Sequence, residues 1–253
     1  MNKKGMSVYT IGMIIAGLVI LLVLGTAISS FGSDFFEGVT SPLDIFLSEK
    51  IDYPDYEEPS FGSVSVTEQG FVSFMNHVNS NYNSFRDDTR SCSCGSSCED
   101  YASSIFTHAS DKKVDPILVL SLLIQESNCR LGDSTDSSHG LMQINCRVWY
   151  NDLGYGSERA CIDELLGDYD KNIEAGVSIL AGYYYGGNRG GSEESFEVDF
   201  NGCSVEKSYT GWLAALRSYN GLGCNPNYPK QDLFVPDIVK RYNVLVNEYN
   251  RIT

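Results

Sequence analysis

The sequence predicts a mostly α-helical domain that follows a transmembrane helix near the N-terminus. Two observations carry this prediction. Apolar residues recur at helical spacing from about residue 67 onward, and residues 11–28 form an almost uninterrupted apolar run. We therefore expect an anchor or signal segment at 1–28, an acidic extracytoplasmic linker at 29–66 and the helical domain at 67–253.

The composition is that of a folded chain with an acidic surface. Hydrophobic residues make up 42% of the 253 residues and charged residues 20%, as in ordinary globular proteins. Lys and Arg number 18 against 33 Asp and Glu, which gives a formal net charge of -15. Such a charge repels phosphate backbones, so nucleic acid is not an expected partner.

The apolar run near the N-terminus is long enough to cross most of a membrane. At a helical rise of ~1.5 Å per residue, it nearly spans a ~30 Å hydrocarbon core. Lys3 and Lys4 precede it and acidic residues follow, which places the bulk of the chain outside the cytoplasm. We expect membrane contact through residues 9–28. A signal peptide cleaved near Gly25-Thr26-Ala27 is the alternative, and the length of the run favours an uncleaved anchor.

The cysteines indicate disulfide bonds and an oxidising compartment. All eight follow the first third of the chain: Cys92, Cys94, Cys98, Cys129, Cys146, Cys161, Cys203 and Cys224. A zinc site needs paired Cys-x-x-Cys spacings, which this set does not supply, and we expect no metal and no other cofactor. Local spacing favours a Cys203–Cys224 bridge, together with either Cys129–Cys146 or Cys146–Cys161.

The strongest helical signal begins at Asp115-Pro116, where Asp is a good N-cap and Pro suits the first helical position. Residues 117–124 are apolar nearly all round, which is typical of a helix buried in the centre of a domain. Further helices are expected at residues 100–109, 172–185, 210–219 and 236–249.

The central helix is expected to end in Gln125-Glu126-Ser127. Glu126 follows Leu122 and Leu123 by four and three positions, so the three side chains share one face. Burial beside apolar side chains raises the pKa of a carboxyl group, which suits a group that must donate a proton near neutral pH. A solvated glutamate at a helix end is the alternative interpretation of the same pattern.

Four motifs in order resemble the soluble lytic transglycosylase domain, which is related to goose-type lysozyme. They are Glu-Ser at 126–127, Gly-Leu-Met-Gln at 140–143, Asn-Ile-x-x-Gly at 172–176, and Ala-x-x-x-Tyr-Asn at 215–220 with Gly221 behind it. The resemblance covers roughly residues 100–250. It implies a lysozyme-like helical fold with a cleft for a glycan strand, and peptidoglycan or a related β-1,4-linked amino-sugar polymer as the partner.

The resemblance also implies roles for single residues. Glu126 would be the catalytic acid/base. The substrate-binding residues would be Ser134, Met142, Gln143, Tyr219 and Asn220. For Met142 and Tyr219, simple core packing is the alternative.

Two reactions are compatible with these residues. Goose-type lysozymes carry candidate aspartates near Gly-Leu-Met-Gln, and the best-matching positions here hold Ser134 and Asn145, which cannot act as bases. Asp133 and Asp136 lie close by in the sequence. Hydrolases use a second carboxylate, whereas the resembled lyases need a single glutamate and close a 1,6-anhydro ring on N-acetylmuramic acid. The pattern favours the lyase, with a hydrolase or a non-catalytic glycan-binding or assembly protein as alternatives.

Overall fold

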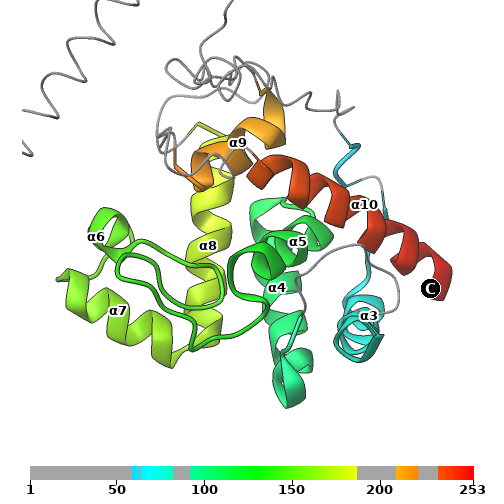
Figure 1. Ribbon diagram of the computed structural model, residues 1–253, viewed down its shortest axis with the longest axis horizontal. Coiled ribbons are helices and arrows are strands. Elements are labelled where there is room, and N and C mark those ends of the chain that lie inside the picture. The colour runs from blue at the N-terminus through cyan, green and yellow to red at the C-terminus, as the bar shows by residue number, and fades with distance from the viewer. Residues whose placement is uncertain (1–58, 63, 82–91, 187–208, 222–232) are drawn as a thin grey trace, which may run out of the picture. The chain divides into compact units, whose positions relative to one another are not determined.

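Helices build the domain around one buried helix, α5 (Figure 1). The computed structural model describes residues 59–62, 64–81, 92–186, 209–221 and 233–253. These belong to the second of two units of the chain, Asp55–Thr253. The expected anchor, most of the acidic linker, and Cys203 and Cys224 lie outside the described residues.

The mostly α-helical prediction is confirmed, and in the described ranges only isolated β-bridges accompany the helices. The helices are α3 (Glu68–Asn81), the short 3-10 helix η3 (Gly95–Ser97), α4 (Cys98–Lys112), α5 (Pro116–Ser127), α6 (Cys146–Trp149), α7 (Glu158–Gly167), α8 (Tyr169–Tyr184), α9 (Gly211–Tyr219) and α10 (Phe234–Ile252). Within these ranges, no helix is both long and apolar enough to cross a membrane.

Helix α5 forms the centre because its sequence leaves it no polar face. All residues from Ile117 to Gln125 are buried, and α4 and α10 pack against the helix. Its start is fixed by Asp115, whose Oδ1 accepts a hydrogen bond from the Ile117 N–H at 2.8 Å. The Oδ2 atom accepts from the Gly62 N–H at 2.6 Å and from the Tyr242 hydroxyl at 2.5 Å. One capping residue therefore joins α5, α10 and the segment before α3.

The packed core extends upstream of residue 67, where the helical domain was expected to begin. Phe61, Val64 and Val66 are partly buried against the core. The Phe61 and Tyr242 rings lie 4.8 Å apart between centroids. This upstream segment therefore contributes apolar contacts to α10.

Helix α8 is the second central helix of the domain and packs against α4, α7 and α9. In Figure 1, α6 and α7 lie on one side of α8, and α3 and α10 lie on the other. The segment between α5 and α6 runs as a long loop that carries the Gly140–Gln143 turn. This loop, α6, α8 and α9 surround the C-terminal end of α5.

Three disulfides lie in the described residues: Cys92–Cys129, Cys94–Cys98 and Cys146–Cys161. Disulfide bonding is thus confirmed for six of the eight cysteines, as is the Cys146–Cys161 alternative. The Cys129–Cys146 alternative is wrong, because the segment before α4 passes the end of α5 and brings Cys92 to Cys129. Disulfides of this kind are typical of an oxidising, extracytoplasmic compartment.

Candidate active site

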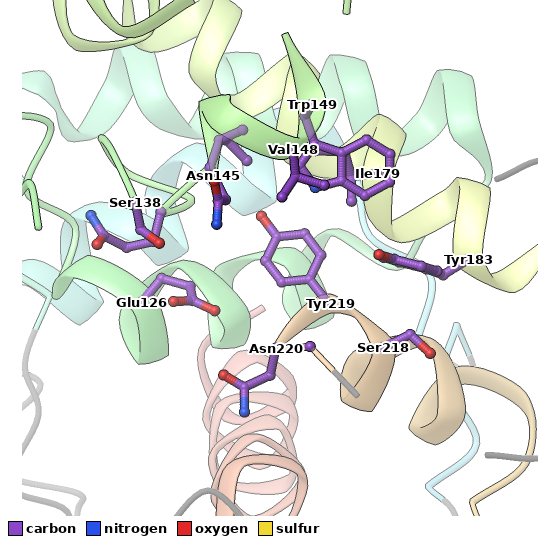
Figure 2. Close-up of a pocket in the computed structure, with 13 residues that line it drawn as sticks. Glu126, Ser138, Asn145, Val148, Trp149, Ile179, Tyr183, Ser218, Tyr219 and Asn220 are labelled. Atoms are coloured by element: carbon purple, nitrogen blue, oxygen red, sulfur yellow. The ribbon is translucent and has the colours of Figure 1, made fainter. Parts of the chain in front are cut away.

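A cavity of about 260 Å³ opens at the C-terminal end of α5 (Figure 2). The described residues that line it come from α5, the loop after it, α6, α8 and α9: Glu126, Ser138, Gln143, Ile144, Asn145, Val148, Trp149, Ile179, Tyr183, Ser218, Tyr219, Asn220 and Gly221. Four of the residues expected at a site, Glu126, Gln143, Tyr219 and Asn220, therefore meet at one cavity.

Glu126 reaches the cavity from the last turn of a helix that is otherwise buried. Its own side chain is half-buried, whereas Leu122 and Leu123 behind it are fully buried. The helix ends directly after it, because Asn128 and Cys129 adopt left-handed backbone angles, with φ of 53° and 62°. The Cys92–Cys129 disulfide ties this end to the segment before α4. The position of Glu126 is thus fixed by the buried helix before it and by the disulfide-bonded segment after it.

The Gly140–Gln143 turn is held by side chains from the other three motifs. The Ser127 hydroxyl donates to the Leu141 carbonyl oxygen at 2.7 Å, and the Tyr219 hydroxyl donates to that of Met142, also at 2.7 Å. Asn172 Oδ1 accepts from the Met142 N–H at 2.8 Å. The four motifs are therefore one connected hydrogen-bonded unit, and Glu126 stands beside it.

Two glycines let α8 approach this turn. Gly140 has a φ of +78°, and a β-carbon there would overlap the Asn172 amide. A β-carbon at Gly176 would lie 2.6 Å from the Met142 side chain. Asn172 and Gly176 are four residues apart, so both face the turn from the same side of α8.

Gln143 uses its amide to close the loop. Its Nε2 donates to the carbonyl oxygens of Gly140 at 2.8 Å and Asp133 at 3.0 Å, and its φ of 49° is left-handed. Both bonds orient the side chain at the cavity wall. The amide oxygen then remains the part of Gln143 with which a ligand can form a hydrogen bond.

Tyr219 stands in the middle of the cavity wall, next to Asn220 (Figure 2). Burial, and then the nearby Glu126 carboxylate, raise the pKa of the Tyr219 hydroxyl well above its ordinary value. The hydroxyl therefore keeps its proton at neutral pH and remains a donor to Met142.

Two expected substrate-binding residues are not part of the cavity lining. The Met142 side chain is fully buried and faces Gly176, so the core-packing alternative describes it. The Ser134 hydroxyl forms a hydrogen bond with His139 Nδ1 at 2.8 Å, and neither residue lines the cavity. Burial lowers the pKa of His139, which is 6% exposed, so the ring is neutral near pH 7.

Neither of the two nearby aspartates belongs to the lining. Asp133 Oδ2 lies 3.7 Å from Arg130 Nη2, and Asp136 is exposed. Glu126 is the only carboxylate among the described residues that line the cavity. Within the same ranges, no group of three or more His, Cys, Asp or Glu side chains could hold a metal ion.

No protein-family model matches the chain, and no curated protein or solved structure matches it either.

The cavity also contains residues that the motifs did not single out, above all Trp149, Tyr183 and Ser218. The rings of Trp149 and Tyr183 meet edge to face at a centroid distance of 5.8 Å. Tyr183 follows Gly176 by seven residues, so helical spacing alone places it on the face of α8 that meets the turn. Trp149 had no such signal, because it belongs to a helix of only four residues.

Proposed function

We propose that this chain is a lytic transglycosylase that cleaves peptidoglycan between N-acetylmuramic acid and N-acetylglucosamine. The observation that carries the proposal is the position of Glu126. It is the only carboxylate among the described residues that line the cavity, and it lies beside the hydrogen-bonded unit formed by the four motifs. A half-buried carboxyl group at the end of a central helix is suited to proton transfer to a bound ligand.

The lining of the cavity suits a sugar. Aromatic rings can contact the apolar faces of a pyranose, and Trp149, Tyr183 and Tyr219 supply them. The same cavity is also lined by amides and hydroxyls that can bind sugar hydroxyls, which belong to Ser138, Gln143, Asn145, Ser218 and Asn220. Ser218 is 2% exposed, and its Oγ has no hydrogen-bond partner among the described residues. A buried polar atom of this kind favours a polar ligand that completes its hydrogen bonding.

In the proposed reaction Glu126 acts twice. Its carboxyl group first donates a proton to the glycosidic oxygen, so that the bond to the muramic acid C1 breaks and the leaving sugar takes up the proton. The resulting carboxylate then accepts the proton of the muramic acid 6-hydroxyl, whose oxygen bonds to C1. This step closes the 1,6-anhydro ring and restores the protonated Glu126, so that water is not consumed.

The absence of a second carboxylate from the described lining favours this lyase over a goose-type hydrolase. An inverting hydrolase needs a second carboxylate about 6.5–9.5 Å from the acid to activate water, and a retaining one needs a nucleophile at about 5–5.5 Å. Asp133 and Asp136 lie outside the lining. We therefore expect the Asp133→Asn and Asp136→Asn variants to keep most of the activity.

The test is mass spectrometry of the products released from purified peptidoglycan. The proposal predicts fragments that end in 1,6-anhydro-N-acetylmuramic acid. Reducing ends, together with an inactive Asp133→Asn or Asp136→Asn variant, would establish the hydrolase instead. A chain that sediments with peptidoglycan but releases nothing would be a non-catalytic glycan-binding protein.

A further inference from the structure

Asn145 lines the same cavity as Glu126, and its side chain does not cap the helix that follows it. It is the residue before α6, where asparagine often caps a helix, yet its side chain forms no cap hydrogen bond. Its Oδ1 is buried and has no hydrogen-bond partner in the part of the chain that the structure describes. The amide oxygen is therefore not bonded by any described residue.

The Asn145 amide points into the cavity on the side where Glu126 lies (Figure 2). Apolar side chains line the same cavity, namely Val148 and Trp149 on α6 and Ile179 on α8. The wall thus combines an amide whose oxygen has no described partner with apolar side chains. It suits a ligand group that carries an amide and a methyl within two bonds of each other.

We propose that Asn145 is a positioning residue that binds the acetamido group of the sugar next to Glu126. This inference rests on the proposed function and extends it to the choice of sugar. As drawn in Figure 2, the Asn145 amide N–H faces Glu126 and can donate a hydrogen bond to the acetamido carbonyl oxygen; turned over, the amide can accept one from the acetamido N–H through Oδ1. The acetamido methyl then contacts Val148, Trp149 and Ile179. A hydroxyl at the same sugar carbon offers no methyl for this surface.

The test compares two neutral β-1,4-linked tetrasaccharides that differ at this group. Chitotetraose carries an acetamido group on each sugar, and cellotetraose carries a hydroxyl. Calorimetric titration uses the Glu126→Gln variant of the full chain, so that neither sugar is cleaved. Asn145→Ala is added to that variant, and Asn151→Ala is the matched control, because Asn151 is exposed and does not line the cavity.

We expect Asn145→Ala to weaken chitotetraose binding by about fivefold to tenfold, as is typical when one hydrogen bond is lost. Cellotetraose binding should stay the same, and Asn151→Ala should change neither affinity. A thermal melt that is unchanged by Asn145→Ala shows that the loss does not come from unfolding.

Three results would overturn the inference. If Asn145→Ala weakens the binding of both sugars equally, Asn145 contacts the ligand without recognising its acetamido group. Chitotetraose binding that Asn145→Ala leaves intact would remove its role while the proposed function stands. If Glu126→Gln binds neither tetrasaccharide, the proposed function fails and the role of Asn145 fails with it.

Discussion

The Gly140–Gln143 turn depends on the absence of a side chain at Gly140. Gly140 combines a φ of +78° with direct contact to Asn172, so its missing side chain is a condition for the packing of α8. We expect Gly140→Ala to lower the free energy of unfolding by about 2–3 kcal/mol, because both strain and overpacking oppose it. Thermal denaturation measures the loss. Gly132→Ala in the same loop is the control, since nothing lies within 4 Å of its added methyl, and an equal loss there would contradict this account.

The Tyr219 hydroxyl is a second single-atom link, between α9 and the turn. Tyr219→Phe removes its hydrogen bond to the Met142 carbonyl oxygen and leaves that acceptor unpaired. The expected loss of stability is about 1–2 kcal/mol, and cleavage should slow because the ring next to Glu126 is no longer fixed. Chemical denaturation and an assay of peptidoglycan release measure the two effects. Unchanged values in both would mean that the motifs do not act as one unit.

Sequence reasoning predicted where the cavity lies better than it predicted which side chains line it. Glu126, Gln143, Tyr219 and Asn220 line one cavity, as the motifs indicated. Met142 does not, because which residues of a four-residue turn face inward depends on its backbone angles and not on residue type. Motif matching also did not identify Ser218 and Trp149 as residues of the cavity wall.

At the scale of helices, α3 and α10 are joined by one charged cluster. Glu248 accepts hydrogen bonds from Arg251 at 2.5 and 2.8 Å, and its Oε1 lies 2.6 Å from His77 Nε2 on α3. The Arg251 hydrogen bonds, and after them His77, hold the pKa of Glu248 at about 2, below its ordinary value of 4.5. A carboxylate with a lowered pKa stabilises the folded state only while it is ionised.

The stabilisation by Glu248 should therefore be complete above about pH 4.5 and lost as the pH falls through about 2. Glu248→Gln should cost on the order of 1 kcal/mol near neutral pH, and nothing at the acid end of this range. Urea denaturation at a series of pH values measures the difference. Asp163→Asn, in an exposed pair with Arg159, is the control and should have little effect at any pH. A constant difference between wild type and Glu248→Gln down to pH 2 would contradict the linkage.

Sequence reasoning located α4, α5, α8, α9 and α10 and missed α6 and α7. It gave no bounds for α3, although Phe71, Phe74 and Val78 recur there at helical spacing. The start of α5 at Asp115-Pro116 was predicted and is confirmed, since the capping signal is local. Helix α6 has four residues, too few for a helical period. Helix α7 buries only Cys161 and Leu165, so its pattern is weak. Both helices depend on tertiary contacts and on the Cys146–Cys161 bridge.

Across the whole molecule, disulfides stabilise the parts that surround the cavity. Cys92–Cys129 holds the end of α5, and Cys146–Cys161 joins α6 to α7. The Cys146–Cys161 bridge spans 15 residues, and the Cys94–Cys98 bridge spans 4. Chain entropy predicts that the longer loop stabilises the fold by about 3 kcal/mol and the shorter one by about 2 kcal/mol.

Replacing each pair by serine and measuring denaturation tests this order. The Cys146→Ser/Cys161→Ser variant should be the less stable of the two and should lose more activity, because Trp149 on α6 lines the cavity. A larger loss in the Cys94→Ser/Cys98→Ser variant would contradict the loop-length argument. In protein from its native compartment, thiol titration after denaturation without reductant should detect no reactive thiol at these six positions.

The proposed mechanism depends on Glu126, so the decisive measurement is the cleavage of peptidoglycan by Glu126→Gln beside the wild type. Glutamine has nearly the same shape but cannot deliver or accept the proton. We expect product release to fall by at least about 10²–10⁴-fold, with the thermal melt and the affinity for chitotetraose unchanged. Turnover that Glu126→Gln leaves unchanged would contradict the mechanism.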